Sequence, residues 1–335
     1  MPLLRNGLKR HWRTLFGVLI SLFFLYLAVR KVDFHAVGEA FREANYLYTI
    51  PNAVAILFCM WLRAVRWRHL LKPVKSLTAG RLFSPVMIGF MANNLLPMRL
   101  GEFVRAYSLG EKEKISKSAS FATIVVERVF DTFILLLMFA IVMAFSPFPD
   151  WANKIGYSAF VINIAILLFF FFLKSKTEPT LRVLQRLLKV FPKKLADFVY
   201  NTTCRFTEGL AVLSDLKSLF YIAALSGLIW VITALSNYFI FLSFGLQPPL
   251  YACFFLLVVV AFAIMLPASP GFIGTFHFGC TVALSYFKID PSVSFPFSVV
   301  LRSCQYFPGT LLGLYYLRKE HLSLREARAE GVQSS

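Results

Sequence analysis

The stretch LFSPVMIGFMANNLLPMRLGEFVR, residues 82–105, is an apolar run interrupted by two prolines, two asparagines and several charged residues. A second apolar stretch, residues 251–287, is interrupted in the same way by PASPGFIGTFHFG at 267–279. An unpaired backbone group in hydrocarbon costs several kcal/mol, so a broken helix persists only where protein or a watery cavity surrounds it. We therefore predict two broken helical hairpins, and such a pair in the two halves of a membrane protein indicates a transport site.

The composition is typical of a protein with many helices in a membrane. The chain has 335 residues, of which 58% are hydrophobic, and only 16% are charged; its mean hydropathy is +0.67. Soluble domains carry about 25% charged residues, and a bilayer-crossing helix needs about 20 apolar residues. We predict an all-α, polytopic membrane helix bundle with two broken or re-entrant hairpins and six full spans, at residues 14–30, 49–67, 118–145, 157–173, 218–244 and 294–317.

The whole chain, residues 1–335, is interpreted as a single membrane domain. Its first half covers residues 1–173 and its second half residues 218–320. A polar cytoplasmic connector, residues 174–217, lies between the halves, and a short polar tail follows at 321–335.

Lysine and arginine are concentrated in four segments: residues 1–13 hold four, 63–81 hold six, 174–217 hold nine and 318–328 hold four. Cytoplasmic loops carry such an excess, so we predict a multi-pass protein of the cell inner membrane with both termini in the cytoplasm. The hairpin at 82–117 would then enter from the inside and that at 251–287 from the outside. This arrangement predicts an inverted repeat in topology, for which residue-level self-similarity gives no support.

The net charge of +18 is spread over the loops, which favours an anionic membrane surface as partner and argues against nucleic acid. The five cysteines show no metal-ligand spacing, so no metal site is expected. The sequence has no Walker loop, nucleotide-binding glycine motif or nucleophile elbow, so we expect no cofactor and no enzymatic activity.

Within the connector, Leu181, Leu184 and Leu188 recur at helical spacing beside Arg182 and Arg186. This pattern predicts an amphipathic helix, which either lies on the inner headgroup layer or packs against neighbouring loops.

The third predicted span contains three charged residues, Glu127, Arg128 and Asp131. A charge near the bilayer centre costs about 2.5–3.5 kcal/mol, so these side chains must face protein or water. Residues three or four apart share a helix face, which places Asp131 beside both Arg128 and Glu127. The three form either an ion pair that locks this helix to a neighbour or a polar wall along a substrate path.

The first broken hairpin places Arg99, Glu102 and Arg105 directly after Asn93, Asn94 and Pro97. Guanidinium groups bind phosphate through two parallel hydrogen bonds, so these arginines suit an anionic headgroup. The alternative is a pair that extends its charges to the membrane interface.

In the second hairpin, Ser269 is expected to cap a helix that begins at Pro270, with the amides around Gly271 to Gly274 free to bind an anion. His277 either titrates near neutral pH or is a hydrogen-bonded packing residue. Arg302, in the last span, needs a bound anion or an acid such as Glu127 or Asp131, and we expect the acid in the empty state.

Three blocks resemble one known family: NNLLPMRLGEFVRAYSL at 93–109, SFATIVVERVFD at 120–131 and PASPGFIGTF at 267–276. Together with the spacing of the spans, they are similar to the flippase-like transmembrane region of lysylphosphatidylglycerol synthases and its stand-alone relatives. The resemblance implies roles for Pro97, Arg99, Gly101, Glu102, Arg105, Glu127, Arg128, Asp131, Pro270, Gly271 and Gly274. Phe272 and His277 depart from the family pattern. The aminoacyltransferase domain of the full-length synthases is absent, so synthesis of aminoacyl lipids is not expected.

We therefore predict a flippase-like protein that moves an anionic phospholipid or a polyprenyl-phosphate-linked lipid between leaflets. The alternatives are an intramembrane lipid-phosphate transferase with Glu127 or Asp131 as base, and a non-catalytic partner of envelope glycosyltransferases. The two hairpins are expected to meet around one polar chamber, where Glu127, Asp131 and His277 would hold or exchange protons. The candidate substrate-binding residues are Asn93, Asn94, Arg99, Glu102, Arg105, Glu127, Arg128, Asp131, Gly271, Gly274, His277 and Arg302.

Overall fold

The computed structural model describes residues 19–30, 32–96, 100–143, 150–188, 193–265 and 270–320, and over these ranges every regular element is a helix. The predicted all-α class is therefore confirmed. Some residues of the sequence analysis lie outside the described ranges, namely residues 1–13, Pro97, Arg99, Pro267, Ser269 and the tail from residue 321.

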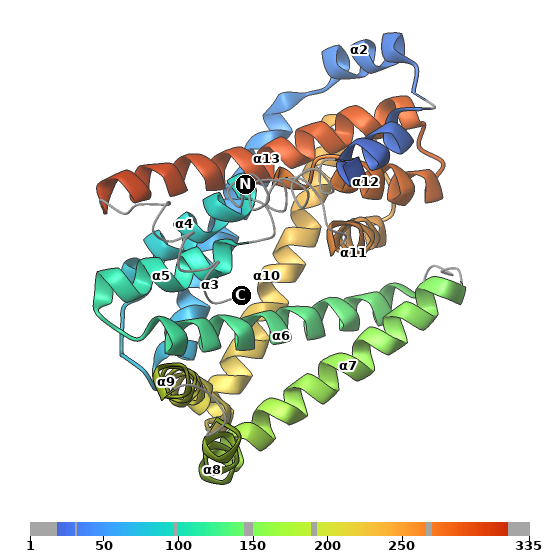
Figure 1. Cartoon of the computed structure of the whole chain (residues 1–335). Helices are drawn as coiled ribbons and strands as arrows, with labels where there is room; N and C mark the ends of the chain where they lie inside the picture. The colour runs from blue at the N-terminus through green and yellow to red at the C-terminus, as the bar shows by residue number, and fades with distance from the viewer. Residues whose placement is uncertain are drawn as a thin grey trace, which may run out of the picture. The chain divides into compact units, whose positions relative to one another are not determined.

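The helices follow the predicted order closely (Figure 1). The first half contains an apolar helix, Leu19–Val29, then α2 (Phe34–Glu43), η1 (Tyr46–Tyr48), α3 (Thr49–Leu71), α4 (Ala79–Leu95), α5 (Gly101–Glu113), α6 (Lys117–Met143) and α7 (Asp150–Ser175). The connector contains α8 (Thr177–Leu188), α9 (Lys193–Gly209) and η3 (Leu210–Ser214). The second half contains α10 (Leu216–Ser243), α11 (Tyr251–Met265), η4 (Pro270–Phe272), α12 (Thr275–Tyr286) and α13 (Pro291–Lys319).

Three of the described helices are long and apolar enough to cross a membrane: Tyr46–Leu71, Gly156–Ser175 and Leu216–Ser243. Two more of the expected spans, α6 and α13, have 27 and 29 residues, which corresponds to about 40 Å of helix. Both carry charged residues inside their apolar sequence, and α13 also contains Pro296 and Pro308. The count of six spans stays a prediction.

Both apolar stretches are interrupted where the sequence analysis expected. α4 ends at Leu95 and α5 begins at Gly101, while α11 ends at Met265 and α12 begins at Thr275. Lys112 near the end of α5 donates to Ser84 near the start of α4 (2.5 Å), so these two helices fold back on each other. α11 and α12 likewise pack together.

The start of the helix in the second break differs from the prediction. Only the 3-10 turn η4 begins at Pro270, and the α-helix starts five residues later, at Thr275. Gly271 (φ 77°), Phe272 (φ 57°) and Gly274 (φ 93°) are in or near the left-handed region, which a continuous right-handed helix cannot accommodate.

The residues group into two compact units, each composed of three chain segments. Unit 1 comprises Met1–Cys59, Phe90–Gly101 and Val231–Leu314, and unit 2 comprises Met60–Gly89, Glu102–Trp230 and Tyr315–Ser335. The units therefore do not coincide with the two halves of the sequence. Within unit 2, α7 packs against α6, and α9 packs against α6 near the end where that helix begins (Figure 1).

The connector forms the expected amphipathic helix, α8, whose leucine face is turned toward protein. Leu181 and Leu188 are buried, and α8 packs against α7 and α9. Val183 and Leu187 on the other side are exposed. The contacts thus favour packing against neighbouring helices for the leucine stripe, which was one of the two alternatives.

The close approach of α9 and α6 depends on Gly209. A Cβ atom at this position would lie 2.4 Å from the Ala119 carbonyl oxygen and 2.6 Å from the Ala122 Cβ. Gly209→Ala should therefore force the helices apart and lower the free energy of unfolding of the full chain by about 1–3 kcal/mol, measured by denaturant titration. Gly80→Ala is the control, because a Cβ on Gly80 meets nothing within 4 Å. An equal effect of both substitutions would contradict the packing argument.

Candidate functional site

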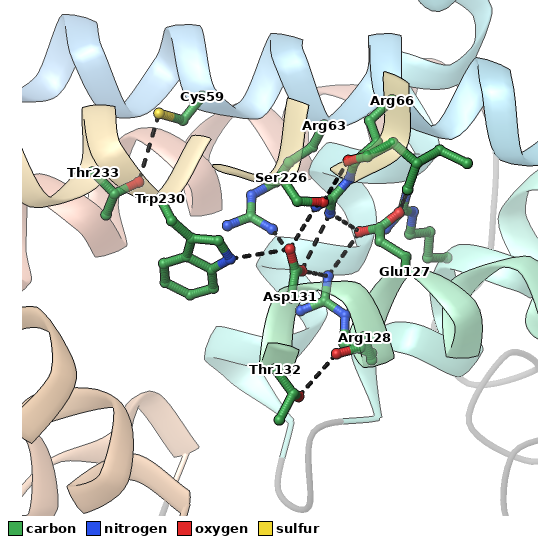
Figure 2. A network of polar contacts seen from close by, with 12 residues as sticks. Cys59, Arg63, Arg66, Glu127, Arg128, Asp131, Thr132, Ser226, Trp230 and Thr233 are labelled. Carbon is green, nitrogen blue, oxygen red and sulfur yellow. Dashed lines mark hydrogen bonds and ion pairs between the residues drawn. The ribbon is translucent and has the colours of Figure 1, made fainter. Parts of the chain in front are cut away.

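Unit 2 contains a buried group of charged side chains from three helices. α6 supplies Glu127, Arg128 and Asp131, α5 supplies Arg105, and α3 supplies Arg63 and Arg66. Residues three apart share a helix face, so the two arginines of α3 both reach the acids of α6. We call these six residues the buried charge cluster; Figure 2 labels all of them except Arg105.

Glu127 is bound by three arginines and is completely buried. Arg105 binds it through two parallel hydrogen bonds, both 2.9 Å, one to each carboxylate oxygen. The Nη2 atoms of Arg66 and Arg128 lie 2.9 Å and 2.8 Å from Oε1. The two-pronged bond to Arg105 joins α5 to α6, and Arg66 joins both to α3.

Asp131 also accepts hydrogen bonds from several donors (Figure 2). Arg66 binds both of its oxygens, at 2.5 Å and 3.2 Å. Arg63 donates to Oδ2 (3.3 Å), and the indole Nε1 of Trp230 on α10 donates to Oδ1 (3.1 Å). Arg128, three residues earlier, lies 3.5 Å from Oδ2, as the helical spacing predicted.

Tryptophan and hydroxyl side chains fix the arginines in place. The guanidinium of Arg105 lies over the ring of Trp67, with its Cζ 3.8 Å from the ring centroid. Trp67 in turn donates from Nε1 to Thr123 Oγ1 (2.9 Å), and Arg66 donates to Ser226 Oγ (2.6 Å). Stacking on an aromatic face stabilises a cation and orients its planar fork.

The cluster holds more positive than negative charge. Four guanidinium groups face two carboxylates, and Glu102, which interacts electrostatically with Arg128, reduces the excess to one positive charge. Within the described residues, the buried Nε atoms of Arg66, Arg105 and Arg128 have no hydrogen-bond acceptor. The arrangement therefore has spare donors and spare positive charge, and both suit an anion.

Arg128 is the accessible arginine of the cluster. Its side chain is 39% exposed, whereas those of Arg66 and Arg105 are 0% and 4% exposed. Arg128 is therefore the most exposed of the four arginines of the cluster.

Unit 1 brings the two helix breaks together around Arg302 of α13. Its Nε donates to the Gly271 carbonyl oxygen (2.9 Å), and its Nη2 donates to Asn94 Oδ1 (3.2 Å). Asn94 is next to the end of α4, and Gly271 belongs to η4. One side chain thus contacts both breaks, and we call Asn94, Gly271, Arg302 and Tyr306 the break junction.

The asparagines of the first break have separate structural roles. Asn94 donates from Nδ2 to Thr310 Oγ1 (2.9 Å) of α13. Asn93 accepts from the Gly101 amide (2.8 Å), so its side chain spans the break and satisfies the start of α5.

The second break presents the Gly271 carbonyl oxygen to Arg302. That the amides of residues 271–274 bind an anion stays a prediction. Gly274 packs closely against the first apolar helix, because a Cβ here would lie 2.1 Å from the Ser21 carbonyl oxygen.

His277 is buried and hydrogen-bonded to Ser298 (2.8 Å). The Ser298 hydroxyl also contacts the Phe295 carbonyl oxygen (2.6 Å). This environment favours the packing alternative, and a role in proton exchange stays a prediction.

The predicted site residues thus fall into two groups. Glu102, Arg105, Glu127, Arg128 and Asp131 lie in unit 2, and Asn93, Asn94, Gly271, Gly274, His277 and Arg302 lie in unit 1. Arg99 lies outside the described residues. Within its own unit, as far as it is described, Arg302 bonds to neutral oxygens and not to the expected acid.

Arg63, Arg66, Trp67 and Trp230 were missed from the sequence. Both arginines had been counted as charges of a cytoplasmic loop, although α3 continues to Leu71 and buries them. Their spacing of three inside a helical apolar run was the signal that would have placed them on one buried face.

Comparison with family models matches residues 14–313 to the lysylphosphatidylglycerol synthase TM region. A UPF0104 membrane protein of Methanothermobacter thermautotrophicus is 26% identical over 83% of this chain and 87% of its own length. The UPF0104 membrane protein MJ1078 of Methanocaldococcus jannaschii is 28% identical over 71% of this chain and 98% of its own length. Glycosyltransferase AglD of Haloferax volcanii is 29% identical over 38% of this chain and 20% of its own length. No solved structure gives a significant match.

Proposed function

Because the chain belongs to the family of the lysylphosphatidylglycerol synthase transmembrane region, we propose that it moves an anionic lipid between the two leaflets of the membrane. The substrate is a phospholipid or a polyprenyl-phosphate-linked lipid. The protein acts as a transporter and not as an enzyme, and it needs no cofactor.

The observation that carries the proposal is the excess of positive charge in the buried charge cluster. Each arginine of the cluster contacts a carboxylate, but the summed charge of the described residues stays positive. Charge inside apolar helices is costly unless it is neutralised, so this excess favours a bound counter-ion. A phosphate group would supply the negative charge, and guanidinium groups bind phosphate oxygens through charge-assisted hydrogen bonds.

The membrane orientation is proposed on a revised count of loop charges. Arg63 and Arg66 belong to the cluster and no longer support the assignment of residues 63–81 to the cytoplasm. Four basic residues remain in that segment, Arg68, Lys72, Lys75 and Arg81, and they still favour the inner side. We therefore propose that both termini are cytoplasmic and that the protein lies in the inner membrane.

The transferase alternative needs Glu127 or Asp131 as a general base. Each carboxylate already accepts from several arginines, and Asp131 also accepts from Trp230. A base must reach the proton that it abstracts, and these contacts surround both carboxylates with competing donors. The geometry therefore favours a binding role over catalysis.

The partner alternative rests on the similarity to glycosyltransferase AglD. A region shared with a glycosyltransferase suits a protein that supplies or receives a lipid-linked sugar at the membrane. If the partner alternative is right, the protein should keep its function when the buried charges are changed and lose it when residues 174–217 are replaced.

Arg128→Gln is expected to slow lipid exchange between leaflets about tenfold, since one charge-assisted bond to the headgroup is worth about 1.5–3 kcal/mol. The exchange of a fluorescent phosphatidylglycerol is measured in proteoliposomes that contain the full chain. Arg128 is chosen over Arg105 because its side chain is 39% exposed, and because Glu127 keeps its bonds to Arg66 and Arg105 when Arg128 is changed.

Arg68→Gln is the matched control, because Arg68 is an exposed arginine on α3 of the same unit. It should exchange lipid at the wild-type rate. Equal rates for the wild type and for Arg128→Gln, with both proteins folded, would refute the assignment. Mass measurement of the lipids that purify with the wild type would identify the headgroup.

A further inference from the structure

Arg302 connects two helix breaks that are far apart in the sequence. Its partners, Asn94 and Gly271, are 208 and 31 residues away from it along the chain. All three residues belong to unit 1. Any change in the bonds of Arg302 therefore acts on both breaks at once.

The surroundings of Arg302 are aromatic, and no carboxylate pairs with it among the residues of the unit that the structure describes. The guanidinium Cζ lies 5.6 Å, 5.3 Å and 5.5 Å from the ring centroids of Phe272, Phe276 and Tyr306. Its two hydrogen-bond partners are neutral oxygens, and Nη1 has no partner among the described residues of the unit. A guanidinium in such a place binds a negative group more strongly than an amide oxygen.

We propose that Arg302 is a second anion site, which binds a singly charged phosphate ester in place of Asn94 Oδ1. Binding would open the bond by which Arg302 links the end of α4 to η4, so the ligand itself would uncouple the two breaks. This proposal rests on the proposed function in one respect: both assume that the ligand is a lipid that carries a phosphate.

The class of ligand follows from the charge. One guanidinium compensates one negative charge, and a doubly charged phosphate would leave a charge uncompensated among three aromatic rings. A phosphodiester headgroup carries a single charge and offers two oxygens for the planar fork of arginine.

The exchange of partners leaves the rest of the fold intact. Asn94 uses its Oδ1 for Arg302 and its Nδ2 for Thr310, so release from Arg302 preserves the bond that ties it to α13. Gly271 is held near Tyr306, since a Cβ on Gly271 would lie 3.4 Å from that ring. The bond from Arg302 to Asn94 is therefore the one that can open.

Hydrogen exchange of the full chain in lipid nanodiscs tests the proposal. In discs containing phosphatidylglycerol, amides of residues 92–96 and 270–276 should exchange about fivefold faster than in pure phosphatidylcholine discs, because the local contact has opened. The soluble diester glycerophosphoglycerol, added to phosphatidylcholine discs, shows whether the headgroup alone suffices. A response to either probe supports the site, and the two probes separate a membrane lipid from a free phosphate ester. No response to either probe overturns it.

Two variants make the test specific. Asn94→Asp supplies a fixed carboxylate to Arg302, so this variant should lose the response to phosphatidylglycerol while remaining folded. Arg302→Gln should exchange rapidly in both kinds of disc and also show no response. Arg318→Gln, an exposed arginine at the end of the same helix, should respond like the wild type. A wild-type response in Asn94→Asp would refute the exchange of partners even if Arg302→Gln failed to fold.

The outcomes also separate this inference from the proposed function. If wild-type protein exchanges lipid between leaflets but shows no change at the break junction, only the second anion site is wrong. If the break junction responds but no lipid crosses the membrane, the site stands and transport is wrong.

Discussion

Glu127→Gln is expected to lower the free energy of unfolding of the full chain by about 3–5 kcal/mol. The substitution keeps the size of the side chain but removes the charge that Arg66, Arg105 and Arg128 share. Four guanidinium groups would then face Asp131 as the remaining carboxylate of the cluster. Denaturant titration in detergent micelles, followed by tryptophan fluorescence, measures the loss.

The matched control is Glu111→Gln, the same chemical change in the same unit. Glu111 pairs with Lys117 (3.0 Å) and Lys114 (3.8 Å), and all three side chains are at least 37% exposed. Ion pairs of this kind contribute about 0–1 kcal/mol. Similar losses for Glu111→Gln and Glu127→Gln would show that the buried charge cluster does not hold α3, α5 and α6 together.

Gly274→Ala is expected to destabilise unit 1 by about 2–5 kcal/mol, the sum of a left-handed backbone penalty and an overpacking penalty. Gly274 has φ 93°, and a Cβ would lie 2.1 Å from the carbonyl oxygen of Ser21. The contact is with backbone, so it cannot be relieved by turning a side chain. The same denaturant titration measures the effect.

Gly227→Ala on α10 is the control for this substitution. A Cβ on Gly227 meets nothing within 4 Å, and alanine is favoured over glycine inside a helix by about 1 kcal/mol. We expect this variant to be as stable as the wild type or more stable. A mild effect of Gly274→Ala would mean that the first helix does not pack against the second break.

The helices and both breaks could be predicted from local patterns. Apolar runs gave the bounds of α3, α6 and α10 to within a few residues, and prolines and glycines gave the places of both breaks. These features act within one helix, so they are readable in a single sequence. The exception was the start of α12, where three residues with positive φ replaced a helical turn.

The partners of the charged residues could be predicted only in part. The pairing of Arg128 with Asp131 followed from helical spacing, and the structure confirms it. The pairing of Arg66 with Asp131 spans 65 residues, and that of Arg302 with Asn94 spans 208. Such contacts depend on how helices pack, and one sequence holds no direct signal for that.

The ion pairs between α3 and α6 also have a consequence for the biogenesis of the protein. α3 carries Arg63 and Arg66, while the carboxylates that neutralise them arrive with α6, 65 residues later in the case of Arg66 and Asp131. At about 5–20 residues per second, the ribosome needs on the order of ten seconds to make that interval. During this time the nascent α3 must keep two arginines at the translocon or in water, because releasing them unpaired into lipid is costly. We therefore expect α3 to enter the lipid together with α6, after α6 has emerged from the ribosome.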